Sequence, residues 1–165
     1  MRSIRCEDYA DVNKYWQSKK VKIAGIQLAI FVRVLHLPRG VTVDSLNSFV
    51  NEQRDSLVQF TKALVSTPSP NPPGDERAVV EVVLAELSRL GLDQEIEVVG
   101  MHADRPNIIA RVRGNSVGPT VMLCGHSDTK PIGDQSKWNT DPMTPEIRDG
   151  KMYGLGATDM KGAVA

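Results

Sequence analysis

Two polar segments in the C-terminal part of the chain carry residues that could bind a metal. The first is Gly125-His-Ser-Asp128, in which one serine separates a histidine from an aspartate. The second is Gly154-Leu-Gly-Ala-Thr-Asp159, where small residues allow the backbone around the aspartate to approach a neighbour closely. Histidine nitrogens and carboxylate oxygens are normal zinc ligands. We therefore predict that His126 and Asp159 bind zinc.

Asp128 has a different predicted role, as a carboxylate of the catalytic site that orients His126. At this spacing it can accept a hydrogen bond from one ring nitrogen, which would fix the tautomer and make the other nitrogen a better metal ligand. A carboxylate with two oxygens, such as Asp159, can also bridge two metals about 3.5–4 Å apart. The structural alternative is that Asp128 only caps its own backbone in a polar loop. The combination of both segments favours the metal site.

A continuous apolar run leads into the histidine. Residues Thr120 to Cys124 are typical of an interior strand that is covered on both faces. His126 would then lie just beyond the strand, where ligands collect in open α/β sheets. Cys124 is expected to be a small buried hydrophobe, because free cysteine packs well in cores.

Two helices and several further strands are expected around this strand. Helical spacing of apolar residues spans about 44–65 and 75–90, and the proline-rich segment 67–74 separates the two helices. Gly91 is placed to hold the left-handed conformation that ends the second helix. The order of elements predicts an α/β fold with helices packed on a mixed sheet. The other predicted strands are 95–99, 107–112 and a hairpin over 146–153 that turns at Asp149-Gly150.

Composition excludes several classes of protein. Lys plus Arg and Asp plus Glu each number 20, so the net charge gives no footprint for nucleic acid or an anionic membrane. No segment has the roughly 20 apolar residues of a membrane helix, and no secretory signal is clear. Cys6 and Cys124 do not form a secreted disulfide framework. We expect a cytoplasmic protein with no nucleic-acid or membrane partner.

Other residues offer weaker chemistry. His102-Ala-Asp104 has the same histidine–aspartate spacing, but it falls in a predicted turn without the glycine setting, so no metal is expected there. A hydrolase that uses Cys124 or Ser127 as nucleophile is disfavoured, because no glycine-flanked nucleophile elbow is present.

The metal-binding segments and the residues around them resemble the co-catalytic zinc aminoacylases and peptidases. That family includes acetylornithine deacetylase, succinyl-diaminopimelate desuccinylase, carboxypeptidase G and aminoacylase-1. The proline-rich segment Ser66–Glu76 is also similar to the start of the family, so the resemblance covers about residues 50–165. The segments that carry it are Gly125-His-Ser-Asp-Thr129, Trp138, Asp141-Pro142 and Asp149-Gly-Lys-Met-Tyr-Gly-Leu-Gly-Ala-Thr-Asp-Met-Lys-Gly162.

The resemblance implies an enzyme that hydrolyses amide bonds in N-acyl amino acids or small peptides, with two zinc ions per complete active site and cobalt or manganese as substitutes. His126 would ligate one zinc, Asp159 would bridge both, and Asp128 would orient His126. A cis peptide bond is implied between Asp159 and Met160. The family usually has arginine where this chain has Leu155, which removes a charge near the site but no ligand.

In the family, the general-base glutamate, the other metal ligands and the inserted dimerisation domain follow the bridging aspartate. We therefore predict that residues 41–165 are the N-terminal portion of a zinc amidohydrolase catalytic domain, a partial zinc-peptidase-like domain truncated at its C-terminus and inactive alone. Residues 1–40 would be an extension of unknown role, whose apolar stretch 21–37 fits either a helix or a strand. The full-length protein is expected to be a homodimer that acts on small molecules. The alternative is a non-catalytic remnant that serves as a binding or interaction module.

Overall fold

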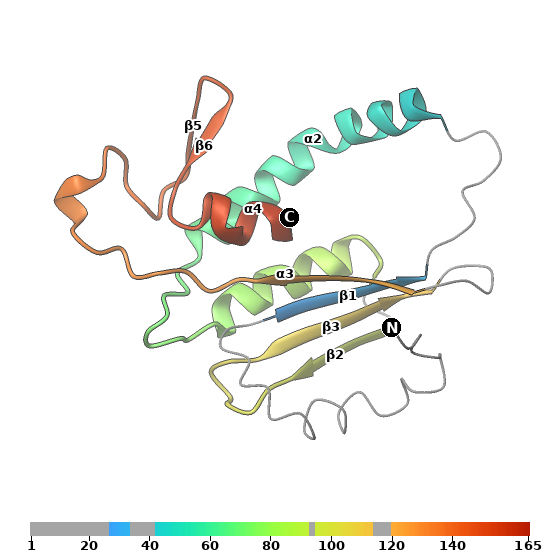
Figure 1. The fold of residues 1–165 in the computed structure, drawn as a ribbon, viewed down its shortest axis with the longest axis horizontal. Coiled ribbons are helices and arrows are strands. Elements are labelled where there is room, and N and C mark those ends of the chain that lie inside the picture. The colour runs from blue at the N-terminus through green and yellow to red at the C-terminus, as the bar shows by residue number, and fades with distance from the viewer. Residues whose placement is uncertain (1–26, 34–41, 93–94, 114–119) are drawn as a thin grey trace, which may run out of the picture.

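The computed structural model describes residues 27–33, 42–92, 95–113 and 120–165, and it has the predicted α/β fold (Figure 1). Among these residues, none of the helices combines the length and the apolar character needed to cross a bilayer. The elements in chain order are β1 (Gln27–Arg33), α2 (Val43–Ser66), α3 (Arg77–Arg89), β2 (Ile96–Val99), β3 (Asn107–Val112), β4 (Thr120–His126), η3 (Gln135–Lys137), β5 (Glu146–Arg148), β6 (Lys151–Tyr153), η4 (Ala157–Lys161) and α4 (Gly162–Val164).

Four strands form the main sheet in the order β2-β3-β1-β4. Strand β1 is parallel to β3, from Leu28 opposite Ile108 to Val32 opposite Val112. It is antiparallel to β4, from Gln27 opposite His126 to Arg33 opposite Thr120. The apolar stretch that fitted either a helix or a strand is therefore a strand in its described part. It joins β3 and β4, which do not pair with each other.

The prediction that β4 is an interior strand is wrong. Among the described residues β4 pairs with β1 alone, so it forms an edge of the sheet. The side chains of Val121, Met122 and Leu123 are 41%, 49% and 56% exposed. Cys124 is also exposed, which corrects the expectation that it is buried. Strand β1 occupies the inner position of the sheet that was predicted for β4. The sequence did not decide whether the stretch that contains β1 forms a helix or a strand.

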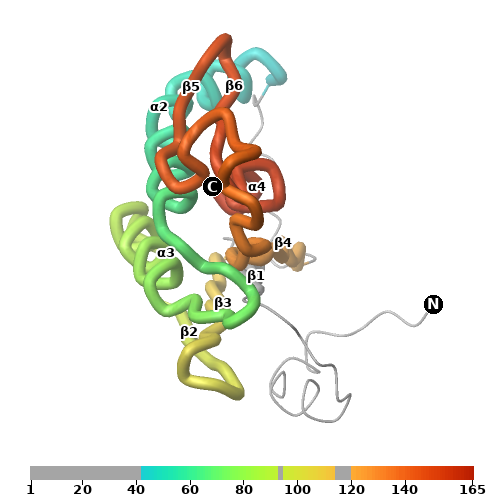
Figure 2. The backbone as a smooth tube through the Cα atoms, turned by 90° about the vertical axis from the view of Figure 1, so that its left-hand side faces the viewer, coloured from blue at the N-terminus to red at the C-terminus, as the bar shows by residue number. Residues whose placement is uncertain are grey.

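Helices α2 and α3 lie on the same side of the sheet, as Figure 2 shows, and α4 lies between α2 and β4. Helix α2 starts with a capping box in which Thr42 and Ser45 exchange hydrogen bonds. Only its C-terminal end is buried, whereas Leu46, Phe49 and Val50 are exposed. Leu90, the C-cap residue of α3, is 50% exposed. The core consists of Leu64, Val79, Val80, Val83, Leu87, Ile108 and Ala110.

The turns predicted from glycine are confirmed. Gly91 has a φ of +69° and ends α3, with its amide donating to the carbonyl of Ser88. Strands β5 and β6 form the predicted hairpin, in which Asp149 and Gly150 have φ values of 50° and 71°.

Candidate metal centre

His126 is the last residue of β4, and its ring lies between two carboxylates. Nδ1 is 2.9 Å from Oδ1 of Asp128, and Nε2 is 3.0 Å from Oδ1 of Asp159. The side chain of Asp128 is 14% exposed, that of His126 36% and that of Asp159 85%. The fold thus brings together the three residues that the sequence singled out, from two segments that are far apart in the chain.

The surroundings of the ring favour one tautomer. Nδ1 faces two oxygen acceptors of Asp128, the carboxylate and, at 3.2 Å, the backbone carbonyl, whereas Nε2 faces one oxygen of the more exposed Asp159. In the neutral tautomer with the proton on Nδ1, Nε2 presents a lone pair toward Asp159. Two acceptors that face each other need a positive charge between them, which a second ring proton or a metal ion supplies.

The pair of His126 and Asp159 has the spacing of two ligands on one zinc ion. With ligand bonds of about 2.0 Å and tetrahedral geometry, two ligand atoms are about 3.3 Å apart, and Nε2 and Oδ1 are 3.0 Å apart. Among the described residues Oδ2 of Asp159 has no partner, so it is open to a second ion. The donor chemistry fits zinc, but the described residues contain no group of three or more side chains that could hold a metal. The described residues thus bring two candidate ligands together and do not by themselves complete a metal site.

The turn that carries Asp159 is tightly built. Gly156 has a φ of +78°, which favours glycine, and its carbonyl accepts a hydrogen bond from the Lys161 amide. A Cβ added at Gly154 would lie 2.5 Å from a methyl group of Val65, so only glycine fits there. The bond between Asp159 and Met160 is cis, as the resemblance implied.

Lys161 is a buried residue of this turn that the sequence did not single out. Its side chain is fully buried, and Nζ donates to the carbonyls of Leu64 at 2.8 Å and Thr67 at 2.7 Å, at the end of α2. Burial lowers the pKa of Lys161 to about 8, and the charge of Asp128 acts in the opposite direction. Lys161 thus ties the Asp159 turn to helix α2. The available signal was a lysine two residues after a candidate ligand and directly before a glycine.

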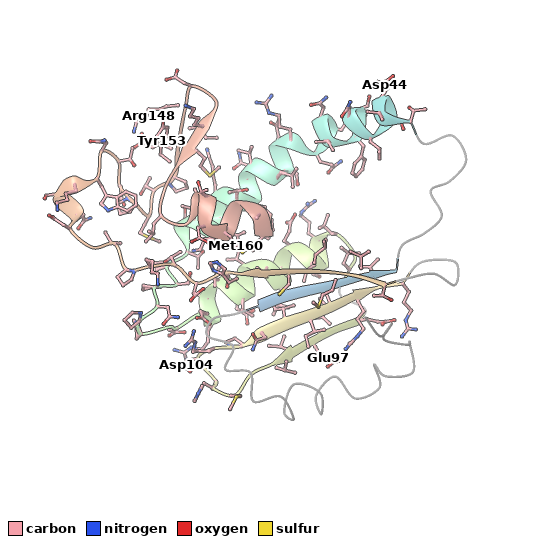
Figure 3. The ribbon with its side chains drawn as sticks, in the orientation of Figure 1. Asp44, Glu97, Asp104, Arg148, Tyr153 and Met160 are labelled. Carbon is pink, nitrogen blue, oxygen red and sulfur yellow. The ribbon has the colours of Figure 1, made fainter. Side chains whose placement is uncertain are left out.

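Gly125, directly before His126, provides space rather than a turn. It lies within β4 and is not among the glycines with positive φ. A Cβ at this position would lie 3.2 Å from Cε of Met160 and 3.3 Å from Cγ2 of Val164. Figure 3 shows Met160 between the C-terminal helix and β4. Gly125 therefore provides space for the segment that carries Asp159.

An open cleft of about 1030 Å³ lies beside the turn that carries Asp159, with Ala157 and Thr158 in its wall. The hairpin forms another wall, in which the guanidinium of Arg148 stacks on the ring of Tyr153 at 5.0 Å (Figure 3). His126 and Asp159 do not line the cleft, but Thr158 directly precedes Asp159. The other lining residues are Thr61, Lys137, Trp138, Asn139, Thr140, Asp149, Lys151, Met152 and Gly154.

Residues 122–165 match the model of peptidase family M20/M25/M40. The match begins within β4 and includes His126, Asp128, Asp159 and Lys161. It supports metal-dependent hydrolase chemistry in general and singles out no particular member of the family. The proline-rich loop and both long helices lie outside the matched residues.

Proposed function

We propose that this chain supplies part of the metal centre of a zinc-dependent amidohydrolase that acts on N-acyl amino acids or small peptides. The observation that carries the proposal is the approach of His126 Nε2 to Asp159 Oδ1 at 3.0 Å, with Asp128 on the opposite ring nitrogen. The family match over residues 122–165 supports the reaction class. The resemblance to deacylases and carboxypeptidases supports the substrate class.

Each of the three residues has a distinct task. His126 Nε2 and Asp159 Oδ1 would hold one zinc, and the open Oδ2 of Asp159 would reach a second. Zinc supplies a Lewis acid that polarises an amide carbonyl and lowers the pKa of water toward neutrality. Asp128 keeps the ring proton on Nδ1, so Nε2 stays available as a ligand. Lys161 holds the Asp159 turn in place.

The complete centre needs more ligands than the described residues bring together. A catalytic zinc normally has three protein ligands, and here two atoms converge. We propose that the remaining ligands and the general base come from polypeptide beyond the described residues. The complete enzyme would then be a homodimer, as the family resemblance implies, and a cytoplasmic protein, as expected from the composition; these residues alone would be inactive.

Zinc binding tests the proposal, because the chain contains a matched control histidine. We expect zinc titration by calorimetry to show binding that falls by more than about 10-fold in His126→Ala. His102→Ala removes an exposed histidine with an aspartate at the same spacing and should leave affinity unchanged. Equal effects, or no zinc binding by the unchanged chain, would favour the non-catalytic binding module. To test the reaction, N-acetyl amino acids are added to the natural gene product and the release of free amine is measured, before and after treatment with a chelator.

A further inference from the structure

The proline-rich loop lies along the segment that carries Asp128, although the two are far apart in sequence. The Asn71 amide donates to the carbonyl of Thr129 at 2.8 Å, and the Thr129 amide donates to the carbonyl of Ser69 at 2.9 Å. The buried hydroxyl of Ser69 donates to the carbonyl of Ser127 at 2.7 Å. These backbone contacts hold the loop in a fixed position beside the end of β4.

From this position, the side chain of Asn71 reaches Asp128. Nδ2 of Asn71 donates to Oδ2 of Asp128 at 2.9 Å, while Oδ1 of the same carboxylate faces Nδ1 of His126 at 2.9 Å. Both oxygens of Asp128 are therefore occupied, one by each neighbour. A continuous chain of contacts runs from Asn71 through Asp128 and His126 to Asp159.

The amide suits this position for two reasons. It is uncharged, so it fixes the carboxylate while leaving its full negative charge to stabilise the proton on Nδ1 of His126. Asp128 is only 14% exposed, so water could not easily replace the lost donor. Without Asn71, the carboxylate could rotate away from the ring, and the ring could place its proton on Nε2.

We propose that Asn71 is a positioning residue of the metal centre, which fixes Asp128 so that His126 presents Nε2 as a lone pair toward Asp159. The inference rests on the proposed function for its purpose, but the contacts that carry it are independent of any metal. Asn71 lies outside the residues that match the peptidase family, so the match does not assign it a role.

A second asparagine separates positioning from simple stabilisation. Nδ2 of Asn107 donates to the carbonyl of Val99 at 3.2 Å, and this side chain is half-buried like that of Asn71. Asn107→Ala therefore also removes a hydrogen bond donated by an asparagine amide, in this case to a backbone carbonyl between β3 and β2, away from His126. Both alanine variants should lower the midpoint of thermal unfolding, but only Asn71→Ala should affect the metal centre.

The experiment combines zinc calorimetry with nitrogen-15 NMR of the His126 ring in the metal-free chain. We expect Asn71→Ala to lower zinc affinity about 10–100-fold and to reduce the population protonated on Nδ1. Asn107→Ala should change neither quantity. If the two variants behave alike in both measurements, Asn71 is only structural and the proposal is wrong.

A double-mutant cycle tests whether Asn71 acts through Asp128. In an Asp128→Ala background, Asn71→Ala should cause no further loss of zinc affinity, because its target is already gone; an additive loss would contradict the proposal. If Asn71→Ala does not fold, Asn71→Leu keeps a similar shape and removes the donor without placing a second negative charge beside Asp128. A chain that binds no zinc would overturn the proposed function, and the NMR measurement would still decide the role of Asn71.

Discussion

The chain contains the same pair of residues twice at the same spacing, in His126-Ser-Asp128 and in His102-Ala-Asp104. In the first, a ring nitrogen lies 2.9 Å from the aspartate. In the second, both side chains are exposed, and no hydrogen bond or ion pair joins them in the part of the chain that the structure describes. Figure 3 places Asp104 in the connection between β2 and β3. Spacing alone therefore does not make a metal site.

The surroundings explain the difference. The first triplet follows a strand, is held by the proline-rich loop and faces the turn that carries Asp159. In the second triplet, the contacts are made by the backbone. The carbonyl of His102 accepts a hydrogen bond from the Arg105 amide at 3.1 Å, and the carbonyl of Asp104 accepts one from the Glu76 amide at 2.9 Å. The second triplet forms a turn that holds the start of α3. A metal-binding geometry depends on what the rest of the fold places opposite the histidine.

The largest predicted effect concerns Lys161, which anchors the turn opposite the first triplet and has no counterpart at the second. Its pKa is lowered from 10.5 to about 8 in the folded chain. Between these values the unfolded chain binds more protons, so stability should rise with pH. At about 1.4 kcal/mol per pH unit, the rise in the free energy of unfolding should approach about 3 kcal/mol. Urea unfolding at several pH values measures it.

Substitution of Lys161 by methionine should remove this rise in the free energy of unfolding with pH, because methionine does not titrate. Asp128 is the charged group that acts on the amine. Lys137→Met, at a side chain that is 81% exposed, is the control and should keep the rise. An equally steep pH dependence in Lys161→Met would show that another group is responsible.

The next effect separates the two aspartates. Asp128→Asn keeps the shape of the side chain but weakens the acceptor for the ring proton, so zinc affinity should fall about 10–100-fold. Asp104→Asn makes the same chemical change at an exposed side chain and should leave zinc affinity unchanged. Calorimetry with the two variants measures the contrast. Similar affinities would mean that Asp128 does not orient His126.

Local signals in the sequence were sufficient for much of this fold. Helical spacing and a cluster of prolines predicted α2, α3 and the break between them, and the glycines at 91 and 150 marked turns that the structure confirms. The approach of His126 to Asp128 and Asp159 was also predictable, because a strand end and a glycine-rich turn are common settings for ligands. The helices and turns depend on neighbouring residues in the sequence, whereas the approach of His126 to Asp159 was expected from the combination of the two segments.

Long-range pairing was not predictable in the same way. The apolar stretch that contains β1 fits both a helix and a strand, so nothing local placed it between β3 and β4 or made β4 an edge. The contacts of Asn71 and Lys161 were missed for a related reason. Their partners are a carboxylate and two backbone carbonyls from distant segments, and no sequence pattern marks such acceptors.

The smallest predicted effect concerns the glycine before each triplet. Gly125 lies directly before His126, and Gly100 lies two residues before His102. Alanine at position 100 would place Cβ 2.7 Å from the backbone oxygen of Arg105, which cannot move aside, so Gly100→Ala should lower stability without changing zinc affinity. In Gly125→Ala, the close neighbours are the flexible ends of Met160 and Val164.

For Gly125→Ala, two contributions to stability should nearly cancel. The contacts cost about 1 kcal/mol, and the reduced entropy of the unfolded chain offsets roughly 0.4–1 kcal/mol of that. Zinc affinity should still fall, because Met160 must shift and it directly follows Asp159. Both variants should be measured by thermal unfolding and by zinc calorimetry. We expect Gly100→Ala to change stability alone and Gly125→Ala to change zinc affinity alone. Loss of stability without loss of affinity in Gly125→Ala would mean that Met160 yields without moving the ligand.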